Sequence, residues 1–292
     1  MKTLMKLLSL YPITFSCVGC GPSEEKPKID VVIISGQSNA VGCTFSNCLN
    51  IDDYFDYNDG YPGIKIAYDC WTKDFEPTRF YSQNSSNGEF VKVKLGQGNF
   101  SGTFGPEIGI SKKLSTTHSN KLFLIKYACG ASNLKDDWAM RDSPMYNRFI
   151  NYVKDRINDL KEMGYDPTIK AFCWMQGEGD SYDGYYQYYY TNIKQFVTNV
   201  RSDLKDLSGN KDVPFIDAGI SDASPWVYYS EVNNAKKQFA DESENNIYID
   251  TIAAGLHTNL EPSFEPDLCH YDTESQIQLG QLFAEAFEQY LD

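Results

Sequence analysis

The strongest constraint on the fold is an unbroken run of apolar, mostly β-branched residues from Val31 to Ile34, which stops at Gly36. A continuous apolar run without alternation indicates a strand that is buried on both faces, as in a parallel sheet. Ser38 follows directly, at the carboxyl end of this strand, where open α/β sheets bind their ligands. A serine acts as a nucleophile only when a base activates it.

The rest of the chain alternates between apolar strands and helical spacing. Strands are predicted at 121–128, 168–175, 213–220 and 246–250, and helices at 105–115, 143–163, 182–207, 231–241 and 273–291. This alternation predicts βαβ units, and hence a flavodoxin-like three-layer α/β/α sandwich with a mainly parallel sheet. The periodicity fails between residues 42 and 102, which we expect to form a long loop insertion over the top of the sheet, with a small hairpin.

The first twenty residues have the pattern of an export signal. Lysines precede an apolar run that is too short to span a bilayer. The run ends in Cys17-Val18-Gly19-Cys20, which resembles the lipobox of bacterial lipoproteins. We expect lipidation at Cys20, with Cys17 or simple cleavage as alternatives. Residues 1–20 are then a leader, 21–29 a tether and 30–292 a single domain. The protein is expected to be exported, as a membrane-anchored lipoprotein or in secreted form.

Charge and cysteine content narrow the range of partners. The formal net charge of −14 over 292 residues argues against nucleic acid or an anionic membrane surface. Contact with a membrane is expected only through the N-terminal lipid. Cys129 and Cys173 lie in predicted buried strands as core thiols, whereas a disulfide among Cys43, Cys48 and Cys70 is an open alternative. No metal or organic cofactor is implied.

Polar clusters follow three of the predicted strands. They are Gly36-Gln37-Ser38-Asn39, Cys129-Gly130-Ala131-Ser132 and Gln176-Gly177-Glu178. The carboxyl ends of parallel strands share one edge of a sheet, so these clusters are expected to meet. A hydroxyl, an approachable backbone N–H and a side-chain amide are the groups that an acyl-transfer site needs. His270 and Asp267 lie just before the last helix, where they could complete the site as base and orienting acid.

These motifs resemble the SGNH hydrolase superfamily. Gly-Gln-Ser-Asn, Gly-Pro-Glu, Ala-x-Gly-x-Ser, Trp-x-Gln-Gly-Glu-x-Asp and Asp-x-x-His occur in this order from Asp30 to the last helix. Within the superfamily, the chain is similar to the sialate O-acetylesterase-like group and to carbohydrate esterase family six, the acetylxylan esterases. The resemblance implies the SGNH hydrolase fold and a carboxylic ester hydrolase that removes O-acetyl groups from sialate or xylan-type glycans.

The resemblance also assigns roles to residues. Ser38 corresponds to the nucleophile, His270 to the general base and Asp267 to its acid partner. The backbone N–H groups of Ser38 and Gly130 and the amide of Gln176 correspond to the oxyanion hole.

Four further side chains correspond to substrate-binding or supporting positions. They are Gln37, Asn39, Glu178 and Trp138, of which Glu178 is an alternative acid partner for His270 and Trp138 is expected to wall the pocket. The chain departs from the family where Ala131 replaces a frequent glycine.

Less specific interpretations stay open for several of these features. Ser38 could simply cap a helix, as serine often does. The six tyrosines between Tyr182 and Tyr190 suggest sugar stacking, although packing of a helix explains them equally well. Asp180 could belong to the site or cap the next helix, and His118 and His257 fit no motif. A lipid or short-chain esterase with the same triad, and an inactive glycan-binding surface lipoprotein, are the alternative functions.

Overall fold

The computed structural model describes residues 25–75, 78–182, 184–259 and 267–292. Cys17 and Cys20, with the whole predicted leader, lie outside the described residues. Among the helices that are described, none is both long enough and apolar enough to cross a membrane.

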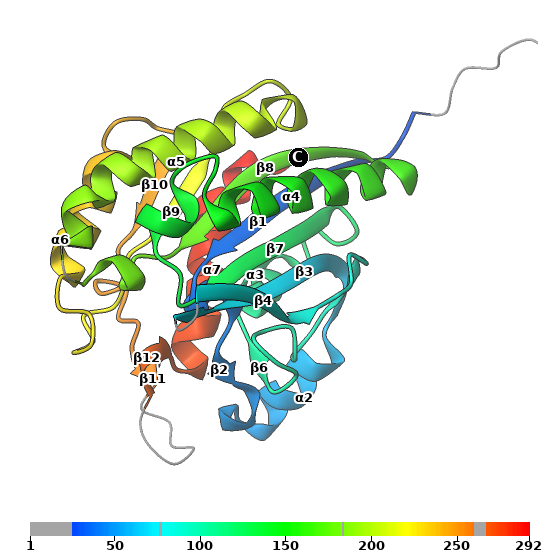
Figure 1. Ribbon diagram of the computed structural model, residues 1–292. Helices are drawn as coiled ribbons and strands as arrows, with labels where there is room; N and C mark the ends of the chain where they lie inside the picture. The colour runs from blue at the N-terminus through cyan, green and yellow to red at the C-terminus, as the bar shows by residue number, and fades with distance from the viewer. Residues whose placement is uncertain (1–24, 76–77, 183, 260–266) are drawn as a thin grey trace, which may run out of the picture.

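A mainly parallel sheet forms the centre of the fold (Figure 1). Its strands run in the order β10-β9-β8-β1-β7-β3-β4, and β5 also pairs with β3. The pairs that β1 makes with β7 and β8 are parallel, as are β3 with β7, β8 with β9, and β9 with β10. The strands of this sheet are β1 (Lys28–Gly36), β3 (Tyr61–Phe75), β4 (Thr78–Ser85), β5 (Val91–Val93), β7 (Leu122–Gly130), β8 (Asp166–Met175), β9 (Phe215–Ala218) and β10 (Asn246–Ile249).

Helices cover both faces of the sheet (Figure 1). Helices α3 and α7 pack against each other on one face, and α4, α5 and α6 lie on the other. The helices are α1 (Ser38–Val41), α2 (Ile51–Asp59), α3 (Glu107–Leu114), α4 (Pro144–Glu162), α5 (Tyr189–Leu204), α6 (Tyr229–Ala240) and α7 (Thr273–Phe287). The predicted three-layer α/β/α class and mainly parallel sheet are confirmed.

The core forms where the predicted apolar stripes meet the sheet. Helix α4 buries Phe149, Val153 and Ile157, which are spaced four residues apart on one face. Phe149 stacks on Phe172 of β8, with their ring centroids 5.4 Å apart. Strand β1 is buried from its second residue to its end, as its continuous apolar run predicted.

The insertion between residues 42 and 102 is not a loop through its length, which corrects the prediction. It contains α2, β3, β4 and β5, together with β2 (Thr44–Phe45), which pairs with β6 (Thr103–Phe104). Strand β3 joins the central sheet beside β7. Many of its residues are only half-buried and several are polar, so the sequence pattern did not mark it as a strand. Only β4 and β5 lie beyond β3 in the sheet, and many β3 residues stay partly exposed, so β3 lacks the continuous apolar run that identified β1.

The helix predicted at 182–207 also needs a correction, because α5 begins only at Tyr189. Gly184 has a left-handed backbone with φ of 79°, and a 3₁₀ turn, Tyr185–Tyr188, follows it. A left-handed residue cannot continue an α-helix, so the helix starts after this turn.

Candidate functional site

The sheet reverses its winding direction at β1. From β1 the chain passes through α3 to the neighbour β7, and then returns through α4 to β8 on the other side of β1. The crevice outside such a switch point is where open α/β sheets bind ligands. Ser38 begins α1 immediately after β1 and is partly exposed at this point.

A tight turn at Gly36 sends the chain from β1 into α1. Gly36 has φ of 139°, and a Cβ there would lie 1.9 Å from the carbonyl oxygen of Met175, so only glycine fits. Gln37 closes the turn by donating its N–H to the same oxygen at 2.8 Å. The backbone N–H of Ser38 donates to no acceptor among the described residues, so it is available to an oxyanion.

Lys126 of β7 holds the other end of α1. Its Nζ donates to the carbonyl oxygen of Val41 at 3.0 Å and to Glu107 Oε2 at 2.8 Å. Both charged side chains are fully buried. A cation at the last carbonyl of a four-residue helix compensates for the bonds that so short a helix cannot make itself.

Gln37 is a supporting residue rather than a substrate contact. Its side chain is buried, and Oε1 accepts from Gln176 Nε2 at 3.2 Å, from the N–H of Gly177 at 3.3 Å and from the N–H of Gly179 at 3.1 Å. These bonds join the turn after β1 to the loop after β8.

Gln176, the predicted side-chain donor of the oxyanion hole, is fully buried in the same network. Its Nε2 also donates to Asp180 Oδ2 at 2.6 Å, and its Oε1 accepts from the Tyr189 hydroxyl at 3.2 Å. Asp180 accepts in addition from the N–H of Leu134 at 2.6 Å, so this carboxylate organises the site loops. Both amide hydrogens of Gln176 therefore have acceptors within the protein, and its oxyanion role stays a prediction.

Gly130 ends β7 beside the nucleophile. A Cβ built on Gly130 would lie 4.0 Å from Ser38 Cβ, so the two residues that should form the oxyanion hole are brought together. Ala131 follows in a left-handed conformation with φ of 58°, which glycine would adopt without the penalty of a Cβ. Ser132 then closes the turn by donating to the carbonyl oxygen of Cys129 at 2.7 Å.

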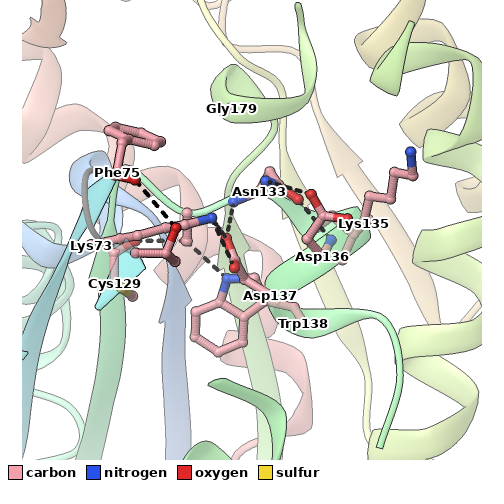
Figure 2. A network of polar contacts seen from close by, with 12 residues as sticks. Lys73, Phe75, Cys129, Asn133, Lys135, Asp136, Asp137, Trp138 and Gly179 are labelled. Carbon is pink, nitrogen blue, oxygen red and sulfur yellow. Dashed lines mark hydrogen bonds and ion pairs between the residues drawn. The ribbon is translucent and has the colours of Figure 1, made fainter. Parts of the chain in front are cut away.

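Trp138 does not wall a pocket, which corrects its predicted role. Its indole is fully buried, and Nε1 donates to Ser132 Oγ at 2.9 Å (Figure 2). The ring lies edge-on to Trp174, with their centroids 5.3 Å apart. Trp138 thus supports the turn after β7 from inside the core.

The same turn is tied to the insertion by a buried ion pair. Lys73 of β3 donates to both carboxylate oxygens of Asp137, at 2.9 and 2.8 Å, and Asp137 also accepts from the N–H of Asn133 at 2.8 Å (Figure 2). The side chains of the pair are 8% and 3% exposed. Burial raises the pKa of Asp137, while Lys73 opposes that rise.

His270 and Asp267 lie on the short strand β12 (Asp267–Tyr271), which pairs with β11 (Thr258–Asn259). His270 Nδ1 lies 2.7 Å from Asp267 Oδ2, and Asp267 Oδ1 accepts from the N–H groups of Cys269 at 2.8 Å and His270 at 3.1 Å. Because a carboxylate only accepts, Nδ1 carries the proton, and Nε2 is left to act as a base.

The surroundings of His270 favour its charged form. Burial lowers the pKa of His270, but hydrogen bonds with Asp267 and with the Cys43 thiol raise it by more. No motif in the sequence marks Cys43 as part of the site. Burial raises the pKa of Asp267, but the bond and charge of His270 and the backbone N–H groups of Cys269 and His270 together outweigh burial, so the pKa of Asp267 is lowered.

Asn39 links the turn that carries Ser38 to the strand that carries His270. Its Nδ2 donates to Glu178 Oε1 at 2.8 Å and to the carbonyl oxygen of Cys269 at 3.5 Å, and its Oδ1 accepts from the N–H of Tyr271 at 3.2 Å. Asn39 therefore holds the residues on both sides of His270. This contact explains why a buried asparagine follows Ser38.

Glu178 is fully enclosed beside this link. Oε1 accepts from Asn39, and Oε2 has no hydrogen-bond partner among the described residues. Burial raises the pKa of Glu178 despite the opposing bond from Asn39. Of the two acids that the sequence left open, Asp267 is the one that binds Nδ1 of His270.

The remaining sequence candidates lie outside this arrangement or at its rim. The His118 ring contacts the Thr117 hydroxyl, and the backbone N–H of His257 donates to Ser275 Oγ. Tyr189 is buried, whereas the Tyr182 ring is 41% exposed and lies edge-on to Trp226. Packing in the core therefore explains Tyr189, while sugar stacking by the exposed Tyr182 stays a prediction.

The cysteines form no disulfide in the described part of the chain. Cys43, Cys70, Cys129, Cys173 and Cys269 are free thiols, and Cys48 forms no disulfide with any of them. Cys129 and Cys173 are buried, as predicted, and burial raises the pKa of both thiols.

Comparison with known proteins identifies the family to which this chain belongs. Residues 28–289 match the model of the carbohydrate esterase, sialic acid-specific acetylesterase family. The chain belongs to this family. It is thus a carbohydrate esterase by family, and the SGNH-type resemblance of its motifs is confirmed.

A curated relative in this family is the probable carbohydrate esterase At4g34215 of Arabidopsis thaliana. It is 27% identical over 286 residues, covering 91% of this chain and 95% of the relative. The crystal structure of that plant protein superposes with a TM-score of 0.61 at 21% identity, covering 91% of this chain and all of the plant protein.

Two further solved structures share the fold. NanS matches with a TM-score of 0.60 at 16% identity, covering 91% of this chain and 98% of its own. XAC1771, a carbohydrate acetylesterase from Xanthomonas citri, matches with a TM-score of 0.54 at 15% identity, covering 90% of this chain and 56% of its own. These likenesses confirm the fold.

Proposed function

We propose that this carbohydrate esterase removes O-acetyl groups from glycans through an acetyl-enzyme on Ser38. The observation that carries the proposal is the Asn39 link, which fixes the strand of the hydrogen-bonded His270–Asp267 pair beside the partly exposed Ser38. Family membership supplies the substrate class, an acetylated carbohydrate.

In the first half-reaction, His270 Nε2 takes the proton of the Ser38 hydroxyl as its oxygen attacks the acetyl carbonyl. The N–H groups of Ser38 and Gly130 stabilise the negative charge on the carbonyl oxygen, each contributing about 3 kcal/mol. The tetrahedral intermediate collapses, the bond to the sugar oxygen breaks, and His270 gives its proton to the leaving sugar alcohol. Asp267 keeps the imidazole oriented and stabilises its charged form.

In the second half-reaction, His270 takes a proton from water, which attacks the acetyl-enzyme. The second tetrahedral intermediate collapses to acetate, and the proton returns from His270 to Ser38. This scheme uses side chains and backbone N–H groups of the protein and one water molecule.

Acetate release from 4-nitrophenyl acetate tests the mechanism. We expect Ser38→Ala to reduce kcat by about 10⁴-fold or more, while the exposed control Ser230→Ala retains full activity. Equal turnover by wild type and Ser38→Ala would show that another group is the nucleophile. Binding of an acetylated glycan without any turnover would instead favour the inactive glycan-binding alternative.

The glycan itself is tested separately. We propose sialate or xylan-type acetyl esters as substrates, and we expect acetate release from one of them to exceed the release from long-chain acyl esters. A preference for long acyl chains would favour the lipid esterase alternative.

We further propose that the protein is exported and carries a lipid on Cys20. The motif around this cysteine and the charged, apolar leader support the proposal. Expression of the full chain in a bacterium, followed by detergent partition and mass spectrometry, should detect a lipidated N-terminal cysteine. Cys20→Ala should abolish the lipid, and loss only in Cys17→Ala would move the site to that residue.

A further inference from the structure

Four elements place their residues in a row along the carboxyl edge of the sheet. Glu178 follows β8, Ser38 follows β1, Gly130 ends β7, and Thr72 lies on β3. These strands are adjacent in the order β8-β1-β7-β3, and Thr72 pairs directly with Gly130. The inserted strand therefore brings Thr72 to the flank of the predicted oxyanion hole.

A small space lies between Thr72 and the nucleophile. The position that a Cβ on Gly130 would take is 3.4 Å from Thr72 Oγ1, 3.7 Å from the carbonyl oxygen of Trp71 and 4.0 Å from Ser38 Cβ. These are the nearest atoms, and all lie at van der Waals distance. The side chain of Thr72 thus bounds the space beside Ser38 on the β3 side.

The base approaches Ser38 from the opposite end of this row. Asn39 Nδ2 binds both Glu178, after β8, and the carbonyl oxygen of Cys269, next to His270. The leaving alcohol must lie at His270, because His270 protonates it. With the carbonyl oxygen held by the N–H groups of Ser38 and Gly130, the acyl group is left to point away from His270, toward β3.

From this geometry we propose that Thr72 is a specificity-determining residue that limits the acyl group to acetyl. The inference rests on the proposed function, because it assumes that Ser38 carries the acyl group. Thr72 contacts the methyl of the acetyl group, and a longer acyl chain collides with it.

The buried ion pair described above fixes Thr72 in place. Lys73 is the next residue along β3, and its two bonds to Asp137 join β3 to the turn that carries Gly130 (Figure 2). Strand β3 is paired with β7 on one side and with β4 on the other, and the charged pair with two bonds adds a side-chain tie between β3 and the turn after β7. Lys73 and Asp137 are positioning residues in this scheme, because neither touches the substrate.

The test compares kcat/KM on 4-nitrophenyl acetate, propionate and butyrate. Thr72→Ala removes the methyl and hydroxyl groups that close the space, so the butyrate-to-acetate ratio should rise about tenfold, the effect of one or two methylenes in a fitted pocket. Thr72→Val keeps the volume, so it should leave this ratio as in wild type. The exposed residue Thr78 provides the control, and Thr78→Ala should leave kcat/KM on all three esters as in wild type.

An unchanged ratio in Thr72→Ala overturns the proposal. An equal rise in Thr72→Val also overturns it, because volume would then not be the cause. The double variant Lys73→Met/Asp137→Leu removes both charges together, so no buried charge is left alone. This variant should raise the ratio in the same direction as Thr72→Ala, and no change refutes the positioning role. Undiminished turnover by Ser38→Ala is a separate result, which refutes the proposed function itself.

Discussion

Asn39→Asp tests the link between the nucleophile and the base with a change of one atom. Asn39 Nδ2 donates to Glu178 Oε1 at 2.8 Å, and both side chains are almost completely buried. Aspartate retains the acceptor for the N–H of Tyr271 but replaces the donor with a second carboxylate. Two carboxylates at this distance cannot both stay ionised, so the pair is expected to share one proton.

The sign of the pH effect follows from the raised pKa. Burial already raises the pKa of Glu178, and a second carboxylate raises the pKa of the pair further. The shared proton therefore contributes fully to the free energy of unfolding below the ordinary carboxyl pKa. This contribution is lost as pH rises through the raised pKa of the pair. With the proton present, a hydroxyl group replaces the lost amide donor, so Asn39→Asp should melt like wild type in acid.

With the proton lost, the variant has a buried charge without a partner. This state should cost about 3 kcal/mol, as does breaking other buried charged contacts. For a protein of this size, such a loss lowers the melting temperature by roughly 6 to 12 °C. The residues beside His270 also lose their anchor, so kcat should fall together with stability.

Melting temperature and acetate release between pH 4.5 and 8.5 provide the assay. Asn151 lies exposed on α4, so Asn151→Asp adds the same charge without the buried contact. The melting curves of Asn39→Asp and Asn151→Asp should diverge as pH rises. Parallel curves over the whole range would refute the reasoning, since they would show that the contact with Glu178 carries no energy.

Three further changes test other contacts of the site. Cys43→Ala removes a group that raises the pKa of His270, so the acid limb of the pH profile of kcat/KM should move to lower pH. An acid limb at the wild-type pH would show that Cys43 does not affect His270. Ala131→Gly relieves a left-handed alanine with φ of 58°, and chemical denaturation should show a gain of up to about 1 kcal/mol, whereas a loss would contradict the strain. Gly130→Ala meets only van der Waals contacts, so it should melt like wild type while its methyl group lowers kcat/KM on acetate by roughly 100-fold; native activity would show that the space is unused.

Much of the fold could be predicted because its strands are buried on both faces. The continuous apolar run of β1 indicates a buried strand, and the apolar residues of α4 at helical spacing indicate a helix. The insertion lacked such a signal, because β3 lies toward the sheet edge and keeps polar residues on its exposed positions. The late start of α5 had a local sign in Gly184, whose left-handed conformation ends any helix.

The candidate site was predictable where a residue type has few alternative uses. Asp267 and His270, three residues apart, were expected to bind each other and do so at 2.7 Å. Thr72 and Cys43 could not be found, because each belongs to a common residue type inside the segment without periodicity. The burial of Trp138 could not be predicted either, because its position after the second motif does not determine which way the side chain points.

The link between Asn39 and Tyr271 spans 232 positions of the chain. During synthesis, the nucleophile therefore leaves the ribosome long before the strand that holds its base. Domains tend to complete as units, and contacts so distant in sequence are among the last to form. A nascent chain in which Ser38 is already folded at the sheet edge still lacks His270. Under the proposed mechanism, hydrolysis therefore cannot begin before β12 has been synthesised and has docked beside Ser38.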